Sequence, residues 1–296
     1  MMTRALSIPI NSTNTVREYV GLTKPRLSFF VIFTCATGMW FAPGEISFWR
    51  VLGTLCFTAL LVGSANAFNC YLERETDALM VRTRTRALPD GRLEPRGAFA
   101  FAFVTGCVAF TLLIVVANLL TACAGLLALL TYACCYTPLK RKTTAALYIG
   151  AIPGAMPPLM GWTAVSNQLD PGAIWIFSLM FFWQLPHFLA ISLYLKKDYE
   201  RAQLKVFSLV YGDRLTIIAA LISSLLLLGV SLVPVYIGLA TQEYGFIALS
   251  LGLLQIVVAA FGLSDRKSSA WPRLLFFSTL FYLLCLFAGL LIGKIG

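Results

Sequence analysis

Residues 51–77 read VLGTLCFTALLVGSANAFNCYLERETD, and this stretch decides the fold. Residues 51–72 are almost all apolar, and charged residues follow immediately from Glu73 onward. A helix that crosses a bilayer needs about 20 consecutive, mostly apolar residues. We therefore predict that residues 51–72 span a membrane and that the charged residues lie at its surface.

The composition of the whole chain supports a membrane protein. Of its 296 residues, 59% are hydrophobic and 12% are charged, whereas soluble domains carry about 25% charged residues. The mean hydropathy is +0.81. A soluble globule of this composition would lack polar surface, and a disordered chain, a nucleic-acid-binding domain or a disulfide-stapled domain fits no better. The eight cysteines lie mostly in apolar stretches without a C-x-x-C pair, so they are interpreted as small hydrophobic residues.

Further apolar stretches predict an all-α, polytopic bundle of nine transmembrane helices in a single domain, residues 1–296, with a polar N-terminal segment at residues 1–22. The nine stretches are Leu27–Ala42, Val51–Leu72, Ala98–Val116, Leu119–Tyr136, Ala146–Val165, Ile174–Leu195, Leu215–Leu239, Tyr244–Leu263 and Leu274–Ile292.

The basic residues predict the orientation of this bundle. The chain has 23 Lys and Arg residues and a net charge of +10. All but Arg50 and Lys294 fall in the N-terminal segment and in alternate loops, which are therefore expected to be cytoplasmic. An odd number of spans then places the C-terminus outside. Because this topology explains the positive charge, no nucleic-acid partner is expected.

Polar residues at the end of the second span predict a functional site. Asn69, Glu73 and Asp77 recur every four residues, which places them on one helix face about 6 Å apart along the axis. Aligned carboxylates favour a divalent cation such as Mg²⁺, which is commonly shared with phosphate groups. The alternative is a solvated helix end whose acids pair with neighbouring arginines. The position at a membrane interface favours function.

Two other clusters lie at predicted cytoplasmic helix ends. Tyr194 precedes the run Lys196-Lys197-Asp198-Tyr199-Glu200-Arg201, and two such ends facing each other could hold a diphosphate with Mg²⁺ between them. Residues 136–142 end the fourth span, and we expect Arg141 and Lys142 there to be ordinary positive-inside anchors.

The single histidine, His187, lies within the sixth span. An ionisable residue in a span is a candidate functional residue that could bind haem iron or act as a base. The alternative is a neutral histidine that is hydrogen-bonded to a neighbouring helix.

Together these motifs resemble those of the UbiA-type intramembrane prenyltransferases, within which the branch that farnesylates protohaem IX is the most similar. Asn69-x-x-x-Glu73-x-x-x-Asp77 followed by Arg82-Thr83-x-x-Arg86 resembles the first acidic motif of the superfamily. The segments that resemble the haem branch are residues 23–26 (TKPR), 136–141 (YTPLKR), 152–162 (IPGAMPPLMGW) and 183–188 (WQLPHF).

The resemblance implies a nine-helix bundle with a cavity that opens toward lipid. It also implies a reaction of farnesyl diphosphate and protohaem IX, with Mg²⁺, that gives haem O for terminal oxidases. A haem A synthase or a terminal oxidase assembly is a possible partner. Since the short N-terminal segment lacks a signal or transit peptide, a bacterial plasma membrane is favoured over a mitochondrial inner membrane.

The resemblance also implies roles for individual residues. Those expected to organise Mg²⁺ and the diphosphate are Asn69, Glu73, Asp77 and Asp198. Those expected to neutralise the departing diphosphate are Arg82, Arg86 and Lys140, with Tyr136 and Tyr194 nearby. Lys24 and Arg26 are expected to bind substrate, and His187 is expected to face the porphyrin.

One position departs from the superfamily. Its second motif is D-x-x-x-D, but Ala202 follows Asp198 at the second position, which leaves the number of metal ions open. Glu200 points about 200° away around the helix. Three other functions are weighed against haem farnesylation: prenylation of an aromatic ring, an ion path through Glu73, Asp77 and His187, and a purely structural membrane subunit.

Overall fold

The computed structural model describes residues 12–264 and 270–293. These residues form helices joined by short connections, without a β-strand in the described ranges, so the predicted all-α fold is confirmed. The beginning of the predicted N-terminal segment, residues 1–11, lies outside the described residues. Four of the basic residues from which the orientation is predicted therefore also lie outside the described residues, namely Arg4, Arg266, Lys267 and Lys294.

Each predicted stretch falls largely within a helix. The elements in chain order are α1 (Ser12–Leu22), α2 (Pro25–Phe41), α3 (Phe48–Leu79), α4 (Pro95–Val116), α5 (Leu119–Leu130), the π-helix η1 (Thr131–Tyr136), α6 (Thr137–Leu139), α7 (Ala146–Ser166), α8 (Pro171–Tyr194), α9 (Lys196–Arg201), α10 (Phe207–Val210), α11 (Gly212–Tyr236), α12 (Gln242–Phe261) and α13 (Trp271–Gly293).

By length and composition, seven segments in the described ranges could cross a membrane, where nine were predicted. The other two predicted spans are α2 and α7. Helix α2 is 17 residues long, which is short for a hydrocarbon core of about 30 Å. Helix α7 carries Pro153, Pro157 and Pro158 and is mostly buried among other helices, so it needs no continuous lipid-facing surface.

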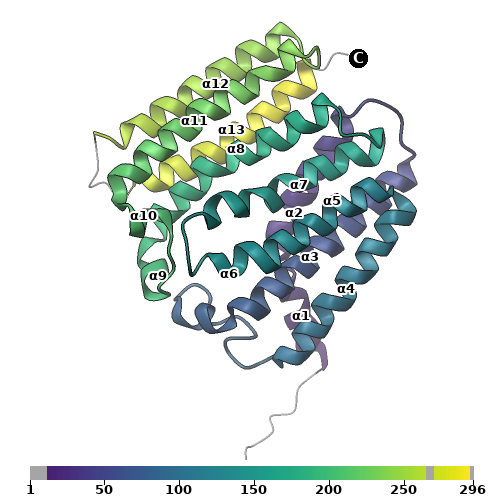
Figure 1. Cartoon of the computed structure of the whole chain (residues 1–296), viewed down its shortest axis with the longest axis vertical. Helices are drawn as coiled ribbons and strands as arrows, with labels where there is room; N and C mark the ends of the chain where they lie inside the picture. Colours follow the sequence, from purple (N-terminus) through teal and green to yellow (C-terminus); the bar gives the residue numbers. More distant parts are fainter. Residues whose placement is uncertain (1–11, 265–269, 294–296) are drawn as a thin grey trace, which may run out of the picture.

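The bundle has two parts on either side of α7 and α8. Helices α1 to α5 lie on one side, and α11, α12 and α13 lie on the other (Figure 1). Helix α7 packs against α2, α5 and α8. The α2–α7 contact is close because both helices use glycine: a Cβ on Gly161 would lie 1.9 Å from the carbonyl oxygen of Cys35, and one on Gly38 would lie 2.0 Å from that of Pro158.

Helix α3 continues beyond the predicted span to Leu79, and its last three turns carry the acidic motif. The end of α3, helix α6 and helix α9 lie at the same end of the bundle (Figure 1). Helix α1 also lies at this end, and Glu18 on α1 forms an ion pair with Arg92 at 2.8 Å. The polar N-terminal segment is therefore helical from Ser12 onward.

Candidate active site at the end of helix α3

Three side chains on one face of α3 form the centre of the site. Asn69, Glu73 and Asp77 are exposed by only 2%, 8% and 1%. A solvated helix end would leave such groups in water, so that alternative to a functional site is not supported. Burying carboxylates is costly unless cations or hydrogen bonds compensate them.

A basic side chain contacts each of these three residues. The Lys24 ammonium donates to Oδ1 of Asn69 at 2.8 Å. The Lys140 ammonium pairs with Oε1 of Glu73 at 2.7 Å. The Arg86 guanidinium pairs with Oδ2 of Asp77 at 2.6 Å.

The contacting cations come from three different connections of the chain. Lys24 lies between α1 and α2 in a left-handed backbone conformation, with φ 49°. Arg86 follows α3, and Lys140 follows α6. The site is therefore assembled from segments that are distant in sequence but meet at one end of the bundle.

Asp77 retains one oxygen that could bind a further group. Its Oδ1 is buried and has no hydrogen-bond partner, and the same holds for the Thr76 hydroxyl beside it. A buried carboxylate oxygen without a donor is costly. Hard divalent cations prefer oxygen ligands, so the donor set of Asn69, Glu73 and Asp77 fits Mg²⁺.

The π-helix η1 positions the side of the site opposite α3. Pro138 has no backbone N–H to donate, and its ring crowds the preceding turn. The backbone N–H of Thr137 bonds instead to the carbonyl of Tyr132. The Thr137 hydroxyl donates to the same carbonyl at 2.8 Å and accepts from the Asn69 amide at 3.1 Å. Thr137 thereby links the π-helix to α3.

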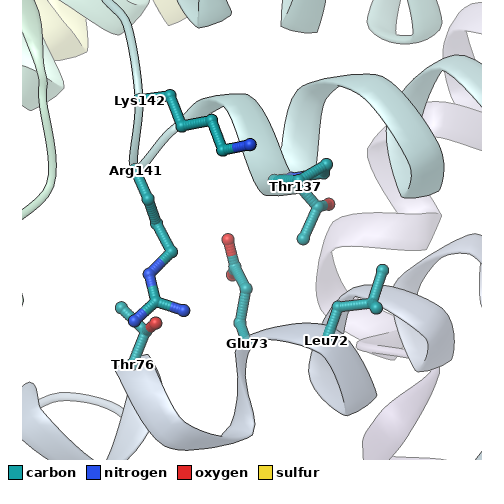
Figure 2. A pocket seen from close by; sticks show the side chains of 7 residues that line it. Leu72, Glu73, Thr76, Thr137, Arg141 and Lys142 are labelled. Atoms are coloured by element: carbon teal, nitrogen blue, oxygen red, sulfur yellow. The ribbon is translucent and has the colours of Figure 1, made fainter.

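A pocket of about 360 Å³ opens beside Glu73. Figure 2 shows the Glu73 carboxylate projecting from α3 toward the segment that carries Thr137, Arg141 and Lys142. Arg141 and Lys142, for which an ordinary positive-inside anchoring role was predicted, both line this pocket, and that role stays a prediction. Two further positive charges therefore lie where an anionic ligand would enter.

Local surroundings shift the ionisation of the two lysines in opposite directions. Burial disfavours the Lys140 ammonium, but the neighbouring Tyr136 and Glu73 side chains hold the pKa of Lys140 above its usual value. The ammonium also lies 5.1 Å from the centre of the Tyr136 ring. Burial lowers the pKa of Lys24, whose ammonium donates to the neutral Asn69 amide.

The second polar cluster lies beside the first but keeps its own partners. The backbone N–H of Lys205 donates to the Lys140 carbonyl at 3.0 Å, which ties the connection after α9 to the site. Asp198 pairs with Arg201 on α9 at 3.4 Å. In the described part of the chain, no three Asp, Glu, His or Cys side chains gather as a metal-binding group. The inclusion of Asp198 among the metal ligands stays a prediction.

The structure explains the missing acid of the second motif. Ala202 is buried in an apolar cluster with Met80 and Leu204, against which Tyr199 packs. A carboxylate at this position would lose its hydration among apolar groups. Glu200 is exposed.

The remaining predicted site residues differ in their exposure and in the side chains that they contact. Tyr136 is half-buried and stacks on Tyr132. Arg82 is exposed; desolvation raises the pKa of the half-buried Tyr199 phenol, and the nearby Arg82 charge opposes this shift. Arg26 is exposed. Tyr194 is 42% exposed and lies beneath the Arg273 guanidinium of α13 at 4.9 Å.

His187 lies on α8, and its side chain contacts α13. Its Nδ1 is 2.8 Å from the Thr279 hydroxyl, and its ring stacks on Trp183 with centroids 4.9 Å apart. The ring of Phe276 lies 4.7 Å away on another side. The alternative of a histidine hydrogen-bonded to a neighbouring helix is therefore observed, while a role toward haem stays a prediction.

Sequence reasoning missed Thr76, Thr137 and Tyr199 as residues of this region. A signal for Thr137 was present, since a Thr-Pro pair inside an apolar helix indicates a local break in the helical hydrogen bonding. Neither Thr76 nor Tyr199 carries a comparable signal, because their positions depend on tertiary packing.

The protein is a helical membrane protein with buried acids, their basic partners and an adjoining pocket at one end of the bundle. These features are those of an intramembrane enzyme that acts on substrates with an anionic end and an apolar body. The chain belongs to the UbiA prenyltransferase family, whose family model matches residues 31–287. Within that family, its similarity to full-length relatives confirms the predicted haem branch. The chain is 47% identical to protoheme IX farnesyltransferase of Anaeromyxobacter dehalogenans, over 94% of each chain. It is 44% identical to the protein of that name from Myxococcus xanthus, over 100% of this chain and 99% of the relative.

Solved structures share the fold. A digeranylgeranylglyceryl phosphate synthase superposes with a TM-score of 0.80 at 13% identity, covering 95% of this chain and 98% of that one. A UbiA homologue of Archaeoglobus fulgidus bound to DMAPP and Mg²⁺ superposes with a TM-score of 0.69 at 14% identity, covering 93% and 99%. At these identities the likeness shows the fold alone.

Proposed function

We propose that this protein transfers the farnesyl group of farnesyl diphosphate to a vinyl group of protohaem IX, with addition of water, giving haem O and diphosphate. Full-length similarity to the protoheme IX farnesyltransferases carries this proposal. The buried acidic face of α3, with a basic partner at every member, supports it, because carboxylates can hold Mg²⁺ that is shared with phosphate and basic side chains can bind phosphate oxygens.

The residues present fit one magnesium-binding face. Asn69, Glu73 and Asp77 would hold Mg²⁺, and Asp198 would contribute from α9. The ion, when bound, supplies positive charge that stabilises diphosphate as a leaving group. Support comes from the unpartnered, buried Oδ1 of Asp77. Mg²⁺ is also present in the A. fulgidus homologue.

The chain's own basic residues would stabilise the leaving group further. Lys140, Arg86 and Arg82 would neutralise charge that develops on the diphosphate as the allylic C–O bond breaks. Arg141 and Lys142 line the same pocket and extend this role. Lys24 and Arg26 would bind the substrate from the start of α2.

The aromatic and apolar residues would receive the substrate bodies. Tyr136 and Tyr194 would lie near the diphosphate end, and the surrounding helices would exclude water from the allylic cation. His187 would face the porphyrin. Its hydrogen bond with Thr279 fixes one ring nitrogen, which would leave the other nitrogen to interact with haem.

The location follows from the same proposal. The protein would lie in a bacterial plasma membrane with its N-terminus in the cytoplasm and its C-terminus outside, as the distribution of Lys and Arg indicates. Opposite placement of α1 and the end of α13 along the bundle supports this topology (Figure 1). An association with haem A synthase or a terminal oxidase assembly stays a prediction.

The test uses purified protein in detergent with haem B, farnesyl diphosphate and Mg²⁺, followed by haem extraction, chromatography and mass spectrometry. The expected product is a more hydrophobic haem with the mass of added farnesyl plus water, absent when EDTA is present. If diphosphate is released only with an aromatic acceptor, the protein is a different prenyltransferase. If folded protein releases no diphosphate with either acceptor, the proposal is wrong.

A further inference from the structure

Each of the three proposed ligand residues on α3 already contacts a basic side chain through one of its oxygens. Lys24 contacts Oδ1 of Asn69, Lys140 contacts Oε1 of Glu73, and Arg86 contacts Oδ2 of Asp77. Because a basic side chain contacts each of the three residues along this helix face, a metal ion that binds all three must displace or share at least one of these contacts. The unpartnered Oδ1 of Asp77 is the exception and gives the ion its first point of attachment.

The charge balance of the site disfavours an ion that arrives alone. Glu73 and Asp77 are neutralised by Lys140 and Arg86. An Mg²⁺ ion would then add two uncompensated positive charges beside Lys24, Arg141 and Lys142. Such repulsion is strong in a partly buried site, where charges are poorly screened.

A diphosphate changes this balance. A single phosphate monoester already carries about −1.5 to −2 charge at pH 7, so a prenyl diphosphate would compensate the ion and offer new oxygen acceptors to the displaced cations. Charge-assisted hydrogen bonds to phosphate oxygens are comparable to those with carboxylates. The basic side chains can therefore leave the acids without becoming unpaired.

We propose that Lys24, Lys140 and Arg86 are placeholders that hold the ligand oxygens of the site and transfer to the diphosphate when it binds, so that the divalent ion binds tightly only together with the diphosphate. The inference rests on the proposed function, because it takes prenyl diphosphate as the substrate. By linkage, the ion strengthens diphosphate binding by the same factor as the diphosphate strengthens binding of the ion.

The test measures binding of Mn²⁺ alone to purified protein by electron paramagnetic resonance, without any diphosphate. Wild-type protein is expected to bind weakly. Arg86→Gln removes one competing cation from Asp77 and is expected to bind Mn²⁺ at least tenfold more tightly while losing prenyl transfer. Gain of metal affinity together with loss of activity is a signature that a purely structural role of Arg86 would not produce.

Two further variants make the result specific. Lys24→Met is expected to tighten Mn²⁺ binding as well, and since the hydrogen-bond partner of Lys24 is a neutral amide, its loss leaves no buried carboxylate unpaired. Arg92→Gln makes the same change in net charge at an exposed ion pair with Glu18 and is expected to leave Mn²⁺ binding unchanged. The inference is overturned if Arg92→Gln tightens Mn²⁺ binding as much as the other two variants do. It is also overturned if neither Arg86→Gln nor Lys24→Met tightens Mn²⁺ binding.

A second measurement addresses the linkage directly. Thermal shifts of wild-type protein are recorded with Mg²⁺ alone, with inorganic diphosphate alone and with both. The combined shift is expected to exceed the sum of the separate shifts, and a full shift with Mg²⁺ alone would contradict the proposal. If haem O forms but these binding results are negative, only the placeholder inference fails. If the binding results are positive but no prenylated haem forms, the proposed function fails instead.

Discussion

Loss of the Lys140 side chain should destabilise the protein through the carboxylate that it leaves behind. The Lys140 ammonium and the Glu73 carboxylate are 2.7 Å apart, with side-chain exposures of 19% and 11%. At an effective dielectric constant of about 20, two unit charges at that distance attract by about 6 kcal/mol. Desolvation offsets part of this attraction, and removing one partner of a buried pair typically costs about 3 kcal/mol or slightly more.

The expected result is therefore a clear loss of thermal stability in Lys140→Met. With roughly 2 °C of melting temperature per kcal/mol for a chain of this size, the midpoint in detergent should fall by about 6 °C. Lys140→Met/Glu73→Gln removes the uncompensated charge and should regain most of that loss. Lys196→Met, which breaks a more exposed pair with Asp213, should shift the midpoint by about 2 °C or less.

The assay is thermal unfolding of detergent-solubilised protein at a fixed scan rate, monitored by intrinsic fluorescence. The decisive comparison is between the single and the double variant. If Lys140→Met and Lys140→Met/Glu73→Gln unfold at the same temperature, the stability does not depend on pairing the Glu73 carboxylate, and the reasoning is refuted.

Three other substitutions test different parts of the structure. Gly161→Ala should lower the midpoint of thermal unfolding strongly, because its Cβ would lie 1.9 Å from the Cys35 carbonyl oxygen. The control Gly229→Ala, whose Cβ would have nothing within 4 Å, should be neutral or slightly stabilising. Equal effects of the two substitutions would contradict the close α2–α7 contact. Asp77→Asn should abolish turnover while membrane insertion and purification yield stay normal, and near-normal haem O formation would remove Asp77 from the metal site. His187→Ala should weaken haem binding, measured by absorbance titration, more than farnesyl diphosphate binding; equal losses would assign His187 to packing alone.

The sequence predicts the helices well because burial in lipid imposes a simple rule of length and apolarity. The predicted stretch 98–116, for example, lies in α4 (Pro95–Val116), close to its bounds. Helix α7 is harder, since its three prolines and many buried positions reflect packing against α2 and α8 rather than contact with lipid. The acidic face of α3 follows directly from helical periodicity, which needs no knowledge of the rest of the chain.

The partners of that face could not be predicted from local patterns. Lys24 and Asn69 are 45 positions apart in the sequence, and Lys140 and Glu73 are 67 apart. Several other basic residues occur in the same loops. Which of them contacts which residue of α3 depends on how the helices pack. The same limit applies to His187, whose partner Thr279 lies 92 positions further along the chain.

The positions of these ion pairs bear on how the protein is made. Every charged contact at the end of α3 is formed by residues between Lys24 and Lys140, so all of them leave the ribosome before α8 to α13. The acidic face can thus be neutralised while the first helices are entering the membrane, without waiting for the C-terminal half. Half of the chain can therefore assemble the charged centre before the helices that follow have been made.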